Sequence, residues 1–231
     1  MMSIDGLGQR LGGRSWVGSL ILALLVISVA ASGSDWPMWR FDANRSAASP
    51  DELPEDLHLQ WVREYPPREQ VWDDPLNHDL MPYDRVFEPV VSDGRMFLGF
   101  NDSGKMVALS TKDGGEIWRF HTDGPVRLPP AVSGDRVFFA SDDGFLYCVD
   151  GRDGELRWKF RGGPSAQQVL GKKHLISAWP ARGGPVVRDA NVYFAASIWP
   201  FMGTFVYALD VETGAVRWVN DGTSAQFIKQ P

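Results

Sequence analysis

Four side chains in the sequence have types and neighbours suited to holding a ligand: Trp179, Arg182, Trp199 and Arg127. A tryptophan near an arginine can hold a flat or anionic group, because the indole face stacks against it and the guanidinium donates paired hydrogen bonds. The same residues also fit a structural role. In that alternative the tryptophans fill packing space and the arginines pair with carboxylates at the strand ends. The sequence leaves both interpretations open.

Other residue types that perform chemistry form no recognisable catalytic motif. The sequence contains no Gly-x-Ser-x-Gly turn, no phosphate-binding glycine loop, no His-Glu-x-x-His and no Cys-x-x-Cys. The polar stretch Glu64–Arg85 holds a cluster of acidic residues and a histidine, whose spacing matches no known metal-ligand pattern. We interpret it as a long solvated loop, and we assign no catalytic residue and no metal ligand. The cluster consists of Asp73, Asp74, His78 and Asp79.

The candidate ligand residues lie between segments that repeat. Ser141–Phe160 has the pattern of two short strands, with turn dipeptides at Asp143-Gly144 and Asp153-Gly154. Similar segments begin at Gly104 and Gly203, so the pattern occurs three times. In each copy a small residue lies ten positions before a tryptophan, and a glycine lies four positions before it. The three sets are Ala108, Gly114 and Trp118; Cys148, Gly154 and Trp158; and Ala208, Gly214 and Trp218.

Each repeat extends upstream through two further strand-like runs, which begin at Pro89, Pro130 and Pro185. One unit therefore has four short strands and about 40 residues, the size of a β-propeller blade. Trp118 and Trp158 are 40 residues apart, whereas Trp158 and Trp218 are 60 apart. We place the additional residues at 162–181 and 198–202.

The repeat resembles the tryptophan-docking repeat of the PQQ-type (pyrroloquinoline quinone) β-propellers. This family includes quinoprotein dehydrogenases and the outer-membrane assembly lipoprotein propeller. The resemblance implies an all-β fold: a β-propeller of four-stranded blades, with three full blades, an N-terminal closing strand and an incomplete ring. Each tryptophan is expected to fill the wedge between neighbouring blades, where burying its ring removes roughly 150–250 Å² from water. The predicted docking residues are Trp61, Trp118, Trp158, Trp218, Gly114, Gly154 and Gly214.

The resemblance is less informative about chemistry, because the repeat is a structural device and a fold does not fix a function. A quinoprotein dehydrogenase would need PQQ, calcium and a catalytic carboxylate in its channel, and no motif assigns these residues here. No cofactor is therefore assigned, and PQQ with calcium is expected only if the full-length protein is an enzyme. Loops of a propeller gather at its faces, where we expect the four candidate ligand residues.

Residues 1–31 have the pattern of a secretory signal peptide, with Arg10 and Arg14 before an apolar run and small residues at its end. We expect cleavage and a secreted or periplasmic protein; the alternative is an uncleaved signal anchor, the one predicted contact with a membrane. Removal of this segment changes the net charge from −6 to −7, because one acidic and two basic side chains are lost. An acidic chain of this kind lacks the basic footprint that nucleic acids require.

The remaining sequence divides into an N-terminal segment, 32–85, and the repeats, 86–231. Within the first part, Leu57–Arg63 resembles the outer strand of a blade, with Trp61 in the docking position. We expect a truncated propeller; the alternative is that three blades close with partner chains. Cys148 is the one cysteine of the sequence, and its position in the repeat predicts a buried, inert thiol.

Three functions remain, in this order. The first is a secreted or periplasmic PQQ-like repeat protein that acts as a binding or scaffold module for an unidentified protein or small molecule. The second is a fragment of a PQQ-dependent oxidoreductase. The third is an envelope assembly factor that captures extended peptides by strand addition.

Overall fold

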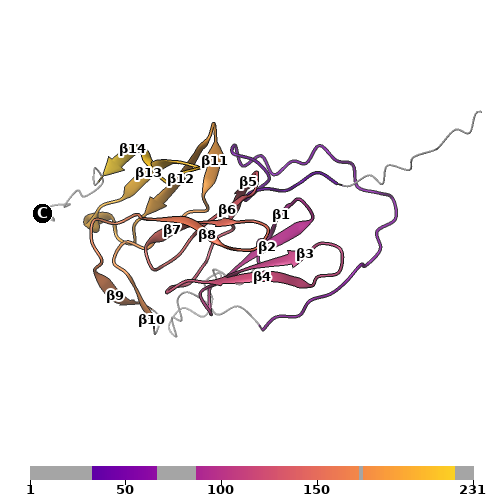
Figure 1. Ribbon diagram of the computed structural model, residues 1–231, viewed down its shortest axis with the longest axis horizontal. Helices are drawn as coiled ribbons and strands as arrows, with labels where there is room; N and C mark the ends of the chain where they lie inside the picture. Colours follow the sequence, from indigo (N-terminus) through magenta and orange to yellow (C-terminus); the bar gives the residue numbers. More distant parts are fainter. Residues whose placement is uncertain (1–32, 67–86, 172–173, 222–231) are drawn as a thin grey trace, which may run out of the picture. The chain divides into compact units, whose positions relative to one another are not determined.

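The computed structural model describes residues 33–66, 87–171 and 174–221. It contains three four-stranded antiparallel sheets and one two-stranded hairpin (Figure 1). The first sheet consists of β1 (Val90–Ser92), β2 (Arg95–Phe100), β3 (Lys105–Ser110) and β4 (Glu116–His121). The second consists of β5 (Ala131–Ser133), β6 (Arg136–Ala140), β7 (Phe145–Asp150) and β8 (Leu156–Arg161). The third consists of β11 (Val186–Arg188), β12 (Asn191–Ala196), β13 (Phe205–Asp210) and β14 (Val216–Asp221). The hairpin joins β9 (Gln168–Gly171) and β10 (His174–Ser177), and η1 (Pro200–Met202) is a single 3-10 turn.

Each sheet is a meander in which every strand pairs with the next one along the chain. The same register shift follows the small residue of the third strand in all three sheets, after Ala108, Cys148 and Ala208. The predicted all-β fold with four-stranded blades is therefore confirmed, with three blades present. The two insertions contain β9–β10 and η1, elements that the first blade lacks.

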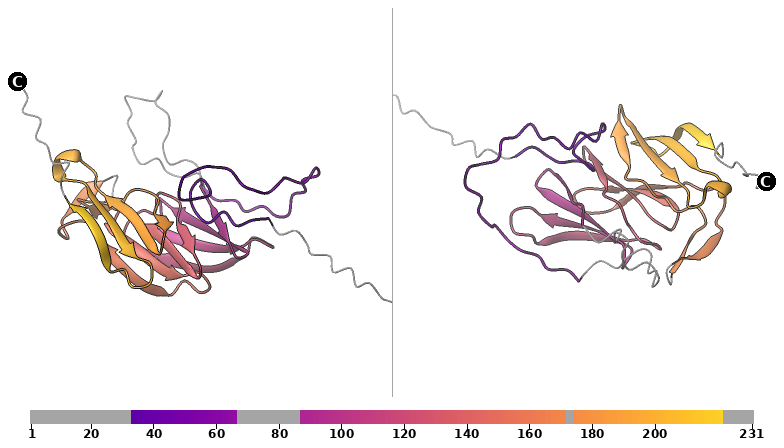
Figure 2. Two further views of the ribbon diagram at one scale, coloured as in Figure 1. Left: turned by 90° about the horizontal axis from the view of Figure 1, so that it is seen from above. Right: turned by 180° about the vertical axis from the view of Figure 1, so that it is seen from behind.

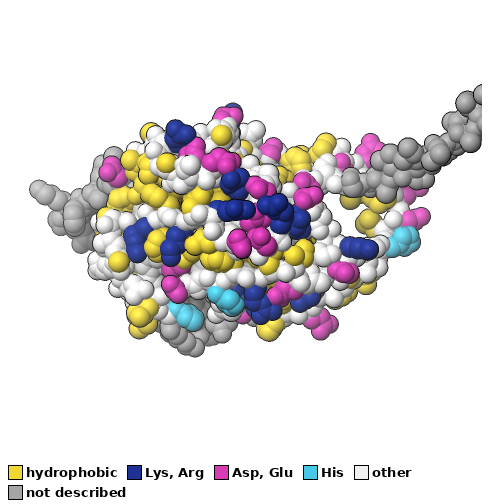
Figure 3. All heavy atoms as spheres, in the orientation of Figure 1, with side chains coloured by type: hydrophobic (Ala, Val, Ile, Leu, Met, Phe, Trp, Pro, Cys, Tyr) yellow, Lys and Arg dark blue, Asp and Glu magenta, His cyan; other side chains and the backbone are white. Residues whose placement is uncertain are grey.

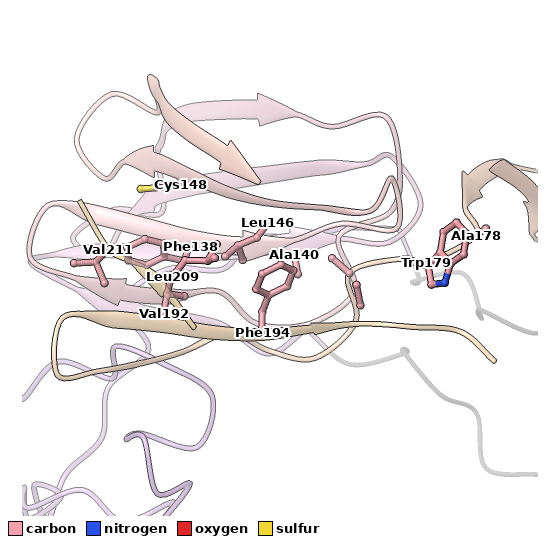
Figure 4. Packing of buried hydrophobic residues seen from close by; sticks show 12 residues of the cluster. Phe138, Ala140, Leu146, Cys148, Ala178, Trp179, Val192, Phe194, Leu209 and Val211 are labelled. Carbon is pink, nitrogen blue, oxygen red and sulfur yellow. The ribbon is translucent and has the colours of Figure 1, made fainter. Parts of the chain in front are cut away.

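The sheets lie side by side in chain order, and buried side chains fill the space between them (Figure 2). Val90 and Phe97 of the first sheet share a cluster with Val137 and Val149 of the second. Figure 4 shows the next interface, where Phe138 and Leu146 meet Val192 and Phe194 of the third sheet. The alternation of the strands dictates this arrangement, because successive side chains point to opposite faces and both faces of the middle blade are covered.

The tryptophan rings lie on the glycine of the following blade. Trp118 packs on Gly154 and Trp158 on Gly214, and a Cβ added at either glycine would lie 2.8 Å from the ring. Each indole N–H also donates to the carbonyl three residues before that glycine, at Gly151 (3.0 Å) and Val211 (3.2 Å). Only a residue without a side chain allows this approach, and the left-handed backbone of both glycines favours glycine as well.

Leu57–Arg63 differs from its prediction as a strand, since no strand is assigned there. Its side chains nevertheless contact the first blade. Trp61 lies on Gly114, where a Cβ would come within 2.7 Å of the ring, and its indole donates to the Thr111 carbonyl at 2.8 Å. The segment thus lies against the first blade through side chains, while its backbone lacks a neighbouring strand within the described residues. A strand assignment requires that backbone pairing.

No described residues pack against the outer face of the third blade. Trp218 is 51% exposed and Tyr193 is 37% exposed, whereas the corresponding Trp118 and Phe97 are buried. A cavity of about 410 Å³ lies beside Trp218 and Tyr193. The structure therefore shows two filled inter-blade interfaces and one open copy of the same surface.

Charged side chains of both signs alternate over the middle of the face shown in Figure 3, with hydrophobic side chains beside them. The part of the chain that the structure describes contains no helix with the length and hydropathy that membrane crossing requires. The predicted signal peptide, most of the acidic loop and the last ten residues lie outside the described residues.

Candidate functional site

The four candidate ligand residues lie at the same end of the sheets. Arg127 belongs to the β4–β5 connection, Trp179 and Arg182 follow β10, and Trp199 belongs to the β12–β13 connection. Because the strands are antiparallel, connections between sheets and turns between second and third strands meet at one end of the blades. We call this the crossover end.

Arg127 and Arg182 converge on the carboxylate of Asp142, in the β6–β7 turn. Arg182 binds it through two hydrogen bonds of 3.0 Å, and Arg127 Nε donates to Asp142 Oδ2 at 2.6 Å. The Asp142 side chain is 1% exposed, Arg127 9% and Arg182 31%. Arg182 is the more exposed of the two guanidinium groups. These ion pairs correspond to the structural alternative that the sequence left open.

Trp179 is buried and serves as packing. Its indole N–H donates to the Met202 carbonyl at 2.8 Å, and its ring lies against Gly163 and near Phe205. This contact holds the turn η1 against the segment that follows β10. A ring in this position offers no open face on which a ligand could stack.

Trp199 has the opposite environment. It is 47% exposed and stacks with Phe201 of η1, which is 57% exposed, with ring centroids 6.0 Å apart. The other insertion also exposes large apolar side chains, Leu170 on β9 and Leu175 on β10. We refer to Trp199, Phe201, Leu170 and Leu175 as the apolar insertion residues. Sequence analysis identified only the first of them, because periodicity does not show which side of an inserted hairpin faces solvent.

A second buried acid lies beside Asp142. Asp143 accepts hydrogen bonds from the Tyr147 hydroxyl (2.6 Å) and from the backbone N–H groups of Phe145 and Asp123. Burial raises the pKa of Asp143, and burial together with the adjacent carboxylate raises the pKa of Tyr147. From sequence alone, Asp142-Asp143-Gly144 indicated a turn and nothing more. A perturbed carboxyl group can mark an active site; these hydrogen bonds tie the turn to β7 and to the β4–β5 connection.

The three sheets and their docked rings define the class of the protein: a β-propeller made of repeated four-stranded blades. The profile of the family described as "Outer membrane protein assembly factor BamB" matches residues 39–229. The chain therefore belongs to this family of PQQ-like repeat proteins.

Two relatives are each similar in sequence to part of this chain. Outer membrane protein assembly factor BamB of Yersinia pestis is 30% identical over 146 residues, which are 61% of this chain and 35% of that protein. Serine/threonine-protein kinase AfsK of Streptomyces griseus is 32% identical over 137 residues, 56% of this chain and 15% of that protein. This chain therefore spans only 15–35% of the length of these two relatives.

A solved structure, the quinohemoprotein alcohol dehydrogenase ADHIIG from Pseudomonas putida HK5, matches with a TM-score of 0.57 and 20% identity. The match covers 81% of this chain and 26% of that one. At this identity the match shows the fold alone.

PQQ is a flat anionic cofactor, and the described residues do not fit it together with its calcium ion. Trp179 is buried, and Arg127 and Arg182 are bound to Asp142. Within residues 33–66, 87–171 and 174–221, no group of three His, Cys, Asp or Glu side chains is arranged to hold a metal ion. We derive no catalytic step through PQQ.

Proposed function

We propose that the chain acts as a binding module of a secreted or periplasmic protein, and that the crossover end is its docking surface for a polypeptide. The observation that carries this proposal is the position of the two insertions. Both interrupt the 40-residue repeat, and both expose large apolar side chains. Exposed apolar groups that gather on a soluble surface commonly mark a contact site.

The hairpin adds a second argument for a polypeptide ligand. β9 and β10 form a two-stranded sheet on their own. The Ser177 N–H on the outer edge of β10 donates to the Asp142 carbonyl, so the outer edge of β9 is the one that presents backbone groups to an extended peptide. Membership of a family described by outer membrane protein assembly also supports a partner that is a protein. In its more specific form, this proposal is that the chain acts as an envelope assembly factor. The oxidoreductase alternative has no support from the side chains described above.

The proposal can be tested with an unfolded outer-membrane β-barrel polypeptide as a fluorescent probe. We expect binding, and we expect the paired change Trp199→Ser and Phe201→Ser to weaken it by about tenfold or more, because aromatic anchors dominate apolar interfaces. The matched control is Leu53→Ser with Leu57→Ser, two exposed leucines of the N-terminal segment. Equal affinity of both paired variants would overturn the docking surface. Dye-linked alcohol oxidation with added PQQ and calcium would favour the oxidoreductase instead.

Export is tested separately, because the predicted signal peptide lies outside the described residues. We propose cleavage after Ala31, so the mature chain recovered from a cell fraction should begin at Ser32. A mature chain that retains its first residues would support the signal anchor.

A further inference from the structure

A cavity of about 420 Å³ lies at the other end of the sheets, between the first and second blades. Arg95 of β2 and Arg152 of the β7–β8 turn line it, together with the apolar side chains of Phe97 and Val132. Cavities of roughly 300–1,000 Å³ with an apolar wall and a few polar groups are typical of small-molecule sites. This cavity is separate from the crossover end and from the proposed docking surface.

The corresponding position between the second and third blades shows which groups fill the same space there. Arg136 is the first residue of β6, as Arg95 is the first residue of β2. Glu212 is the second residue after β13, as Arg152 is the second residue after β7. Between the second and third blades, Arg136 donates to the carboxylate of Glu212 across the interface. Between the first and second blades, the residue that corresponds to Glu212 is Arg152, so a guanidinium replaces the carboxylate.

Arg95 and Arg152 therefore lack the inter-blade carboxylate of the neighbouring interface. Arg95 NH1 donates to Asp93 of its own turn at 2.6 Å, and Asp93 is largely exposed. Arg152 is held by Asp150 of its own blade through hydrogen bonds of 3.1 and 2.8 Å. No ion pair among the described residues joins Arg95 to the second blade. A carboxylate brought by a ligand would take the position that Glu212 has at the next interface.

Acidic side chains at the rim of the cavity indicate which other charged group a ligand would carry. Asp35, Asp93 and Asp135 line the same cavity. Asp35 accepts from the Ser92 hydroxyl at 2.7 Å and from the Asp93 backbone N–H at 3.1 Å. Asp93 is paired with Arg95 at 2.6 Å, and Asp135 is paired with Arg136 at 2.8 Å and lies 3.8 Å from Arg152. Asp35 instead accepts only from uncharged donors among the described residues, so its carboxylate would attract an ammonium group. The lining thus offers partners of both signs within one small space.

We propose that this cavity binds a small zwitterion of the amino-acid class. Its carboxylate is held by Arg95 and Arg152, its ammonium group faces Asp35, and its apolar side chain lies against Val132. At the next interface, the carboxylate of Glu212 occupies the position that corresponds to the ligand carboxylate.

Calorimetric titration of the full chain with L-leucine tests the proposal. L-leucine should bind saturably, and at least about tenfold more tightly than 4-methylpentanoate, which lacks the ammonium group, or 3-methylbutylamine, which lacks the carboxylate. Arg95→Gln should weaken L-leucine binding by about tenfold or more. Arg152→Gln removes the second guanidinium of the cavity and should also weaken L-leucine binding by about tenfold or more. Arg188→Gln, at the end of β11, is the matched control and should change nothing, because Arg188 forms an ion pair with Asp189 outside this cavity.

Three results would overturn the proposal. The first is the absence of saturable binding of L-leucine to the wild-type chain. The second is equal affinity for L-leucine and 4-methylpentanoate, because the acidic rim would then contribute nothing. The third is unchanged L-leucine binding by Arg152→Gln in a chain with a wild-type circular dichroism spectrum.

Discussion

Gly154→Ala probes the contact between a tryptophan ring and the following blade. Gly154 has a φ of +77°, and a Cβ there would lie 2.8 Å from two carbon atoms of the Trp118 ring. The left-handed backbone costs an alanine about 1–2 kcal/mol. Forcing a methyl group into a packed contact costs about 1–3 kcal/mol more. We expect the free energy of unfolding to fall by about 2–5 kcal/mol, a large part of the roughly 5–15 kcal/mol typical of a domain.

Gly134→Ala is the matched control. Gly134 also has a left-handed backbone, with φ +59°, but a Cβ there would meet nothing within 4 Å. This change should therefore cost only the backbone strain, about 1–2 kcal/mol. The difference between the two variants, about 1–3 kcal/mol, isolates the contact with the ring.

Urea unfolding followed by far-ultraviolet circular dichroism measures both variants, with the slope of each transition checked for constancy. In a Trp118→Ala background the clash is absent, so Gly154→Ala should then cost no more than Gly134→Ala does. This coupling is what a double-mutant cycle reports. Equal destabilisation by the two glycine variants, or a Gly154→Ala penalty that persists without the ring, would refute the proposed docking role.

Three further predictions concern other buried groups. Trp158→Ala should lower the free energy of unfolding by about 3–5 kcal/mol, whereas Trp218→Ala should change it by less than about 1 kcal/mol, because Trp218 is half-exposed. Hydrogen bonds from Arg152, then from Arg157, hold the pKa of Asp150 well below its ordinary value of 3.8. Stability from Asp150 is therefore complete above pH 3.8 and decreases below it, so Asp150→Asn should flatten the fall in Tm towards about pH 2.5. Burial raises the pKa of the Cys148 thiol to about 12, so a thiol reagent should label it only after unfolding.

Each of these predictions has a contradicting result. Equal losses for the two tryptophan variants would mean that the third blade is covered as the second one is. An Asp150→Asn variant whose Tm falls with acid as steeply as the wild type would show that this carboxylate does not contribute to the acid sensitivity. Rapid labelling of Cys148 in the native chain at about pH 8 would contradict its burial.

The sequence was informative about the blade because the blade is a local structure. Period-2 alternation and turn dipeptides predict adjacent antiparallel strands, and the fixed distance from Ala108 to Trp118 repeats twice more. Each strand pairs with its sequence neighbour, so the signal and the contact lie within a few residues of each other. The two strands predicted within Ser141–Phe160 correspond to the observed β7 (Phe145–Asp150) and β8 (Leu156–Arg161), the second of which ends one residue beyond that stretch.

The candidate site was less predictable, because its contacts join residues far apart in the chain. The sequence indicated that Arg127 and Arg182 could pair with carboxylates, but it could not identify Asp142 as the shared partner. It also named Trp179 and Trp199 as equivalent candidates, whereas one ring is buried and the other exposed. Periodicity gives the direction of a side chain within a strand, and it says nothing about an irregular loop whose surroundings come from another blade.

By itself, therefore, the sequence determined the repeat, the four-stranded blade and the positions of the glycine and tryptophan residues in it. The tertiary structure decided which blade supplies the glycine beneath each ring, that Arg95 and Arg152 line one cavity where Arg136 pairs with Glu212 at the next interface, and that Trp218 stays half-exposed. The physical reason is the range of the interactions. Hydrogen bonds within a meander connect neighbours along the chain, whereas packing and charge pairing between blades depend on surfaces that meet only after each blade has formed.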